Sequence, residues 1–563
     1  MNKKLRTSLF ALLVLACGGA LGAGAMLALL YNKPGKNMVW KLGRIADTRK
    51  ADSPELAAQG AKAWQPAAGM KVEVAATGFD FPTRIVFHPT APKTPDAPFY
   101  YVAELGGTIK AVTRDGHIKT VADKLLNFKR GFLDELGLIG LAYDEIDNQL
   151  FFSTTYWDEA EAVFRNKVDR LQVSPDGLAT SDRTTILDMK NEETVASYQI
   201  QFCALGPDGL LYVGVGSGGR KIDAQNLEKF AGKILRMNKD GTPVDTNPFY
   251  TADHTAPRAY IFAYGMRNPY DIAWDPRSAT PIVSDVGPGI DRIFRLAPGV
   301  NYVFGNDDNQ MRANALYTWG PGSGFAPTGV TFAKNDALGV EHAYRLFVGL
   351  FGAVYLPGPN DGKRITRFDI GPDGWLQSAA SDLITYTGSR FASVTDVEWG
   401  PDGLYFADLY GESTEPHMGG GAIFRVVPDP DWKPPTDVNL TLTGAARGRY
   451  LFFDTRCNAC HTIEGAGGRE GPTLTNARET LSKRLLAPDY DRWLDELAVK
   501  EGRFFEKNRD KYQTLKGKNG LDRVRTWLHY HIREPRFDNP KAKMPSHDLS
   551  DEDIDAIAAF LLK

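Results

Sequence analysis

The sequence predicts a multidomain protein, in which a six-bladed all-β propeller is followed by a small all-α domain and preceded by an N-terminal transmembrane anchor. Three observations predict this arrangement. A strand motif recurs six times between residues 69 and 428, the periodicity becomes helical after a proline-rich stretch, and the N-terminal run is uncharged. The length of 563 residues agrees, because single hydrophobic cores stop growing at about 250–300 residues.

The first segment, residues 1–32, has the features of a membrane anchor. Three of its first six residues are basic, and no charged residue follows from Thr7 to Asn32. About 20 apolar residues span a bilayer, and basic residues stay on the cytoplasmic side. We therefore expect an uncleaved anchor in a bacterial inner membrane, with the bulk of the chain in the periplasm. A cleaved signal peptide and a lipoprotein cleavage site at Cys17 are the alternatives.

Residues 33–68 are rich in Ala and Lys and are expected to form a linker, after which the propeller should occupy residues 69–428. Each repeat contains a short strand with a β-branched residue. In every copy but the first, a basic residue follows two positions later. The copies are Ile109, Val168/Arg170, Ile234/Arg236, Ile293/Arg295, Ile365/Arg367 and Ile423/Arg425. Such sheets bury both faces only by stacking around an axis, so six copies predict six blades. A β-sandwich array or a solenoid is the alternative.

Residues 429–442, with four prolines in the stretch 428–439, are expected to form a second linker. The pattern then becomes helical, and residues 443–563 should form the α domain. Its last helix is predicted after Ser550 as N-cap, with acidic residues in the first turn. Ile554, Ile557 and Leu561 would share its apolar face.

Composition excludes one class of partner. The net charge is −3 with 24% charged residues, so no basic field is available to hold nucleic acid. Of the four cysteines, Cys17 lies in the apolar segment and Cys203 in a strand-like stretch, where a buried inert thiol is expected. The remaining two, Cys457 and Cys460, belong to the stretch "RCNACHTIEG".

The Cys-x-x-Cys-His motif at residues 457–461 predicts one covalently bound haem c. Its two thiols can form thioether bonds to the haem vinyl groups, while the imidazole of His461 reaches the iron. Zinc binding would need a second ligand pair at finger-like spacing, and a thioredoxin-like pair would need a βαβ context. Neither pattern is visible in the sequence.

Residues 443–563 resemble class I cytochromes c. The motifs are Gly448-x-x-x-Phe452, "CNACH", "GPTL" (471–474), "KMP" (543–545) and the terminal helix. The resemblance implies that the carbonyl of Pro472 orients His461 and that Met544 is the sixth iron ligand. Met/His ligation suits transfer of single electrons to an acceptor cytochrome or oxidase. His529 and His531 are rival ligands that we expect at the helix surface or beside the haem propionates.

Most of residues 70–428 resembles the soluble glucose and sorbosone dehydrogenases, quinoproteins that oxidise sugars with pyrroloquinoline quinone (PQQ) and calcium. The motifs are "ELGLIGLAY" (135–143), "LGPDGLLYVGVGSGGR" (205–220), "YGMRNPYDIAWDP" (264–276) and "SDVGPGIDRI" (284–293). The resemblance implies that Arg267 and Asn268 contact the quinone, that the carbonyls of Gly287 and Pro288 bind its calcium, and that Glu135 lies at the site. A fixed arginine would stabilise the negative charge that hydride transfer places on the quinone.

The sequence departs from this family at the catalytic base and at the cofactor carboxylates. Tyr198 stands where the family has its histidine base, and an ordinary tyrosine, with a pKa near 10, is a poor base at neutral pH. Ser393 and Thr395 stand where the family has two basic residues.

Three interpretations follow from these departures. The chain is a quinoprotein dehydrogenase that oxidises a small sugar or alcohol and reduces its own haem, or its propeller is a non-catalytic docking scaffold for the cytochrome, or the same site carries out a different reaction with Glu135 or Tyr198 in a new role. In the two catalytic interpretations, Tyr198, Glu135 and Arg267 are the candidate catalytic residues, and in all three the haem works in the same way.

Overall fold

The structure is a computed structural model. It describes residues 54–563 apart from 90–92, 131–134, 288, 306–307, 320–323, 354–356, 361, 379, 412–419, 432–441, 456, 464–465, 468–470, 543, 545–546 and 548. The predicted anchor, residues 1–32, lies outside this range, as does most of the proline-rich linker. None of the helices in the described part of the chain is both long and apolar enough to cross a membrane.

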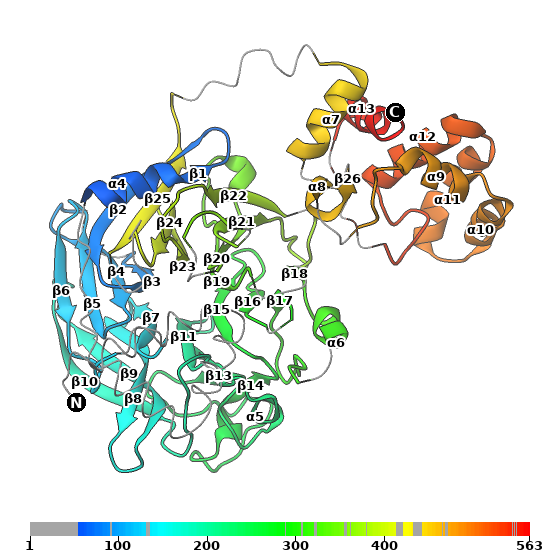
Figure 1. Cartoon of the computed structure of the whole chain (residues 1–563). Helices are drawn as coiled ribbons and strands as arrows, with labels where there is room; N and C mark the ends of the chain where they lie inside the picture. The colour runs from blue at the N-terminus through cyan, green and yellow to red at the C-terminus, as the bar shows by residue number, and fades with distance from the viewer. Residues whose placement is uncertain are drawn as a thin grey trace, which may run out of the picture.

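The described residues of the N-terminal two thirds form six antiparallel sheets arranged as blades around an axis (Figure 1). Blades 1 to 3 contain β3 (Pro82–Phe87), β4 (Pro98–Glu104), β5 (Thr108–Thr113) and β6 (Ile118–Ala122); β7 (Leu138–Asp144), β8 (Gln149–Asp158), β9 (Val163–Val173) and β10 (Thr180–Asp188); and β11 (Ile200–Leu205), β12 (Leu211–Val215), β13 (Lys233–Met237) and β14 (Ile261–Tyr264). Blades 4 to 6 contain β15 (Pro269–Trp274), β16 (Pro281–Asp285), β17 (Asp291–Arg295) and β18 (Tyr317–Trp319); β19 (Pro327–Phe332), β20 (Leu346–Leu350), β21 (Arg364–Phe368) and β22 (Ser381–Tyr386); and β23 (Val394–Gly400), β24 (Gly403–Asp408), β25 (Gly421–Pro428) and β2 (Met70–Phe79). The predicted six-bladed propeller is confirmed.

The ring closes through blade 6, where the first strand of the propeller pairs with the last. β2 runs antiparallel to β25, with Val72 opposite Val426 and Met70 opposite Pro428. The first strand of each blade lines the axis and contacts the first strands of both neighbouring blades. The recurring strand motif falls on the third strand of every blade, from β5 to β25. The sequence period therefore corresponds to one blade.

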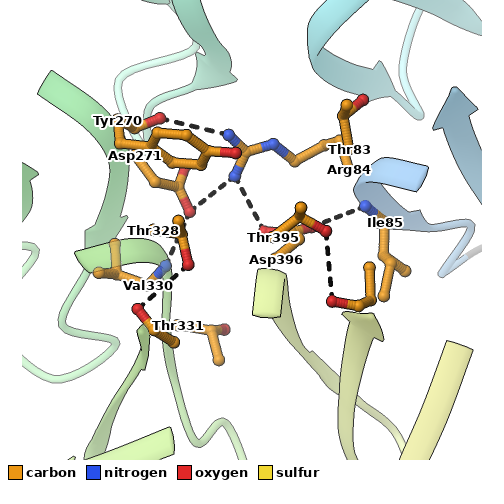
Figure 2. A network of polar contacts seen from close by, with 12 residues as sticks. Thr83, Arg84, Ile85, Tyr270, Asp271, Thr328, Val330, Thr331, Thr395 and Asp396 are labelled. Carbon is orange, nitrogen blue, oxygen red and sulfur yellow. Dashed lines mark hydrogen bonds and ion pairs between the residues drawn. The ribbon is translucent and has the colours of Figure 1, made fainter. Parts of the chain in front are cut away.

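A buried charge cluster joins the strands at the axis (Figure 2). Nη1 of Arg84, on β3, lies 2.8 Å from Oδ2 of Asp271 on β15 and 3.0 Å from Oδ1 of Asp396 on β23. Each carboxylate also accepts a hydrogen bond from a backbone amide: Ile85 N–H donates to Asp396 at 2.7 Å and Val330 N–H donates to Asp271 at 2.8 Å. One guanidinium therefore cross-links blades 1, 4 and 6.

The stretch that we expected to be a linker contributes to the propeller. α4 (Pro54–Ala63) is followed by β1 (Trp64–Pro66), which pairs with β22 as a fifth strand of blade 5. Trp64 is fully buried, and its indole N–H donates to Oδ2 of Asp408 at 3.0 Å. Its ring packs against Tyr386 and Phe406. Burial of this one large aromatic side chain explains why the segment is ordered on the propeller.

The C-terminal domain is mainly helical. It contains α7 (Gly444–Asp454), α8 (Cys457–Cys460), β26 (Thr462–Ile463), β27 (Ala466–Gly467), α9 (Ala477–Leu485), α10 (Pro488–Val499), α11 (Arg503–Lys516), α12 (Gly520–Arg533) and α13 (Asp551–Leu561). Helix α13 begins as predicted, because Ser550 Oγ accepts a hydrogen bond from Asp553 N–H at 3.2 Å. It crosses α7 closely at Gly448, where an added Cβ would lie 1.8 Å from the carbonyl oxygen of Ala556. Gly448 is therefore needed for this helix contact.

Candidate functional site

The loop between β14 and β15 holds Arg267 and Asn268 in a rigid frame. Their backbone N–H groups both donate to Oδ1 of Asp285, at 3.2 and 2.8 Å. The other oxygen of Asp285 accepts two hydrogen bonds from Arg292, at 3.0 and 2.8 Å, and both side chains of this ion pair are fully buried. Two charge-assisted hydrogen bonds from one guanidinium to one carboxylate oxygen fix the direction of the carboxylate as well as its distance. The predicted quinone-contacting residues are therefore firmly positioned.

The structure brings together the three candidate catalytic residues. The guanidinium carbon of Arg267 lies 3.9 Å from the centroid of the Tyr198 ring, in a cation–π contact. The backbone N–H of Tyr198 donates to Oε2 of Glu135 at 3.4 Å. A carboxylate, a phenol and a guanidinium therefore meet at the starts of blades 2, 3 and 4. We call this place the propeller mouth.

The backbone of Tyr198 adopts a left-handed conformation, with φ of 60°. Phe81 and Ala326, which directly precede the first strands of blades 1 and 5, have φ of 53° and 48°. The conformation therefore recurs where the chain turns into an inner strand, and it places Phe81, Tyr198 and Ala326 at the same end of the propeller.

Three buried polar atoms near the mouth have no hydrogen-bond partner among the described residues. They are Oε1 of Gln199, Oγ of Ser217 and Oδ1 of Asn268. Backbone hydrogen bonds hold them near one another: Ser217 N–H donates to the carbonyl of Arg267 at 2.8 Å, and Gly216 N–H to that of Gln199 at 2.7 Å. Buried acceptors in native proteins usually bind a donor, so this group suits an ordered water or a polar ligand.

The two positions that lack the family's basic residues face the protein interior. The Ser393 hydroxyl donates to the carbonyl of Ala392 at 2.6 Å, and the Thr395 hydroxyl donates to the carbonyl of Pro82 at 2.8 Å. Both side chains are buried. Neither residue is available to bind an anionic ligand at the mouth.

Sequence reasoning missed Arg130. Its guanidinium carbon lies 5.1 Å from the centroid of the Phe81 ring. Phe81 belongs to an apolar cluster with Leu105, Ile139, Phe391, Leu409 and Tyr410. Arg130 is thus a second basic side chain at the end of the propeller that carries Tyr198. A single arginine outside the quoted motifs gave no sequence signal for this position.

Buried Asp291 holds the segment at Gly287. Gly287 N–H donates to Oδ1 of Asp291 at 3.0 Å, and Ala326 N–H donates to Oδ2 at 2.9 Å. Burial raises the pKa of Asp291, while the charge of Arg267 opposes the shift. Pro288 lies outside the described residues, so a calcium site built from the carbonyls of Gly287 and Pro288 stays a prediction.

The Cys-x-x-Cys-His motif forms the short helix α8 and its end. Nδ1 of His461 donates to the carbonyl of Pro472 at 2.8 Å, which leaves Nε2 to face an iron. An added Cβ on Gly471 would lie 2.4 Å from the imidazole, so only glycine fits beside the ring. Cys457 and Cys460 lie at the two ends of α8, one helical turn apart, and neither is in a disulfide bond. The donor set and its orientation fit a covalent haem with His461 as axial ligand.

Of the other predicted haem residues, Met544 and His531 lie inside the domain and His529 lies at its surface. Met544 is partly buried and packs against the core of the domain, as does Cys457. His529 lies at the surface, 3.3 Å from Asp551 and 3.2 Å from Asp555. His531 is instead turned into the domain. Sequence reasoning missed His547, three residues after Met544. Burial lowers the pKa of its imidazole, and the charge of His461 lowers it further.

A model of the family described as Glucose / Sorbosone dehydrogenase matches residues 91–408, more than half of the chain. The chain belongs to the glucose/sorbosone dehydrogenase family. A cytochrome c model matches residues 445–563, which shows that a cytochrome c domain is joined to this dehydrogenase-family propeller. The cytochrome domain accounts for one covalent haem c. The chain thus combines a sugar-dehydrogenase fold with an electron-transfer domain.

Known proteins are similar to the propeller and to the cytochrome domain of this chain. Aldose sugar dehydrogenase YliI of Escherichia coli is 34% identical over 212 residues, which are 35% of this chain and 53% of that protein. The chain therefore spans about half the length of this relative. Cytochrome c2 of Afifella marina is 32% identical over 118 residues, which cover 21% of this chain and 78% of the cytochrome. A crystal structure from Thermus thermophilus, described as an oxidoreductase (glucose dehydrogenase), is 26% identical with a TM-score of 0.50 and covers 64% of this chain and 100% of its own.

The mouth fits PQQ unevenly. Arg267 suits the quinone end, whose carbonyl oxygens accept hydrogen bonds, whereas the unpaired oxygens of Gln199 and Asn268 need a donor. The side chains at positions 393 and 395 offer no cation to the carboxylates of PQQ, whereas Arg130 is a basic side chain beside the apolar cluster of Phe81. PQQ binding by this family member is therefore taken up below as a proposal.

Proposed function

We propose that the protein is a membrane-anchored periplasmic dehydrogenase that oxidises a small sugar or alcohol with PQQ and passes the electrons through its haem c to a respiratory cytochrome or oxidase. The observation that carries the proposal is the presence, in one chain, of an Arg267–Tyr198–Glu135 mouth on a sugar-dehydrogenase propeller and a complete haem-binding motif. A two-electron oxidation site needs a one-electron outlet, and the cytochrome domain supplies one.

PQQ, when bound, would supply a two-electron acceptor. Arg267 would provide a fixed positive charge beside it, because its backbone is held by the buried Asp285–Arg292 pair. Asn268 would orient the same end by donating from its side-chain N–H groups, and its unpaired oxygen would take a donor elsewhere on the ligand or from water. Arg130 would face the opposite, anionic end.

Substrate oxidation also needs an acceptor for the hydroxyl proton. Tyr198 occupies the position of the family base, but its ring lies against a guanidinium. Glu135 places a carboxylate oxygen at the backbone of the same residue, 3.4 Å from its nitrogen. We assign Glu135 as the proton acceptor in this proposal, with Tyr198 as the residue that packs Arg267.

The test uses the full-length protein with its haem. PQQ and calcium are added, then aldoses, sorbosone or simple alcohols, and the haem absorbance is followed. Reduction of the haem that requires PQQ and a substrate supports the proposal. Tight PQQ binding with no haem reduction by any of these substrates contradicts the substrate class. Separation of membranes from the periplasmic fraction tests the anchor, because an anchored protein sediments with the membranes.

A histidine at the family's base position provides a second test. In Tyr198→His, an imidazole with a pKa near neutrality stands at the family position, so we expect PQQ-dependent haem reduction at least about tenfold faster than in the wild type. Tyr198→Phe is the matched control, because it keeps a ring against Arg267 and adds no base. Equal rates in the histidine and phenylalanine variants would show that Tyr198 does not occupy the base position.

A second function has its own supporting observation. The side chains at positions 393 and 395 are buried and bound to main-chain carbonyls, and Tyr198 covers the guanidinium of Arg267. Such a mouth suits a non-catalytic propeller that docks the cytochrome within a membrane complex. Failure to bind PQQ with the haem intact would favour this scaffold role over the dehydrogenase.

A further inference from the structure

A stack of side chains centred on Trp527 lies in the helical segment between the haem-binding motif and Met544. The imidazole of His531 stacks on the Trp527 ring, with 4.2 Å between centroids and 17° between planes. The guanidinium carbon of Arg484, on α9, lies 4.4 Å from the centroid of the same ring. Because the imidazole covers one face of the indole, the guanidinium lies over the other. His531 is therefore packed against a support on α12.

That support is itself fixed by hydrogen bonds. The indole N–H of Trp527 donates to Oδ2 of Asp538 at 2.7 Å, and the Tyr490 hydroxyl donates to the same oxygen at 2.6 Å. Asp538 is 5% exposed, and the indole N–H of Trp493 donates to its backbone carbonyl at 3.0 Å. Two aromatic donors on one buried carboxylate hold the Trp527 ring, and so they hold the imidazole on it.

His531 belongs to the haem pocket. Burial lowers its pKa to about 4, the charge of Asp538 opposes this shift, and the charges of Arg484 and His461 add to it. Burial also lowers the pKa of His547, with His461 as a second cause. His461 is thus within electrostatic range of both His531 and His547. The backbone N–H of His547 also donates to the carbonyl of Ile532, the residue after His531, at 3.2 Å, which holds the segment after Met544 against α12. Met544 and Cys457 pack against the hydrophobic core of the domain, to which Trp527 and Ile532 of α12 also belong.

The ring nitrogens of His531 make no hydrogen bond within the described part of the chain. Its Nδ1 atom is buried. A buried donor without an acceptor loses its hydration and gains nothing in return, which destabilises the fold. The polar atoms that a haem brings into such a pocket, apart from its iron, are the two propionate carboxylates. We propose that His531 donates a hydrogen bond to a haem propionate and is held in position for this by Trp527.

The contact has a measurable consequence for the haem. A propionate carries negative charge, which favours the oxidised iron. A donor on the carboxylate withdraws part of this charge and therefore favours the reduced iron. Loss of the donor should lower the reduction potential while iron ligation stays the same.

The experiment compares His531→Leu and His531→Gln in the full-length protein with its haem, by spectroelectrochemical titration. At a fixed applied potential, we expect His531→Leu to show a threefold to tenfold smaller ratio of reduced to oxidised haem, where tenfold corresponds to about 59 mV for one electron. His531→Gln keeps an N–H donor and should stay within about twofold of the wild type. The matched control is His529→Gln on the same helix, which should leave the ratio unchanged because His529 pairs with Asp551 and Asp555.

Two results would overturn the proposal. One is a wild-type ratio in His531→Leu. The other is loss of the methionine–iron charge-transfer band in that variant, which would show that His531 acts through the Met544 segment. If His531→Leu takes up no haem, ¹⁵N-histidine spectra of the wild type decide instead. A hydrogen-bonded His531 nitrogen that shifts between oxidised and reduced haem supports the contact, and a nitrogen that is insensitive to the haem in both states refutes it.

Discussion

The haem centre and the propeller mouth are built in opposite ways. Cys457, Cys460 and His461 lie on one short helix and its next residue, and the carbonyl that orients the imidazole comes from Pro472. Glu135, Tyr198 and Arg267 come from the starts of three different blades. A local motif needs every member for its chemistry. A site assembled from separate loops can exchange one member while its frame stays.

The frame of the mouth shows which members can be exchanged. Arg267 and Asn268 depend on the Asp285–Arg292 pair, whose side chains are fully buried, so a change there would leave an uncompensated charge in the core. Tyr198 lies at the surface of the mouth and bonds through its backbone. The frame therefore fixes the backbone at residues 267 and 268, where the chain has the family arginine and asparagine, whereas the family base position holds Tyr198.

Removal of both haem thiols should have the largest effect. We expect Cys457→Ala/Cys460→Ala to lose covalent haem completely, because each thioether bond needs its sulfur. Haem staining after denaturing electrophoresis measures this. The control is Cys203→Ala in the propeller, where the thiol is 2% exposed and outside the motif, and which should keep the haem. Covalent haem in the double variant would contradict the assignment of the motif.

In the propeller, the charge cluster at the axis depends in the same way on one residue, Arg84. Arg84→Met leaves Asp271 and Asp396 buried without their cation, so we expect the free energy of unfolding to fall by about 3–5 kcal/mol. Urea denaturation followed by circular dichroism measures the change. Arg492→Met, at an exposed pair with Asp489, is the control and should cost less than about 1 kcal/mol. Equal stability of the two variants would show that the axis tolerates the unpaired carboxylates.

The sequence predicted features that repeat or that are local. The blade period was visible because each third strand repeats one residue pattern, and the haem motif because its members are adjacent. The role of residues 54–66 was not visible, since it depends on Trp64 reaching Asp408, 344 positions away. Arg130 and His547 were missed for the same reason: each is a single side chain, and only the tertiary fold brings it to Phe81 or into the range of His461.

Arg130 is the candidate cation for the carboxylates of PQQ at the mouth. If it faces the anionic end of PQQ, Arg130→Gln should weaken PQQ binding by about tenfold to a hundredfold, the value of one charge-assisted hydrogen bond. Calorimetric titration with PQQ and calcium measures the dissociation constant. Arg258→Gln, at the exposed pair with Glu228, is the control and should bind PQQ as the wild type does. Unchanged affinity in Arg130→Gln would place the cofactor carboxylates elsewhere.

The smallest expected effect is a pH dependence of propeller stability. Burial raises the pKa of Asp396 to about 7, although Arg84 opposes the shift and Asp271 adds to it. A carboxyl whose pKa is higher in the folded than in the unfolded chain stabilises the fold fully below its unfolded value of about 3.9. This contribution is lost as the pH rises through about 7. The free energy of unfolding should therefore fall between about pH 4 and 7, by less than about 1.4 kcal/mol per pH unit. Asp396→Asn removes the titrating group, so its urea-denaturation midpoints should depend less on pH than those of the wild type. If the two pH profiles run parallel, the Asp396 carboxylate is ionised throughout, and the guanidinium of Arg84 outweighs the burial of both acids.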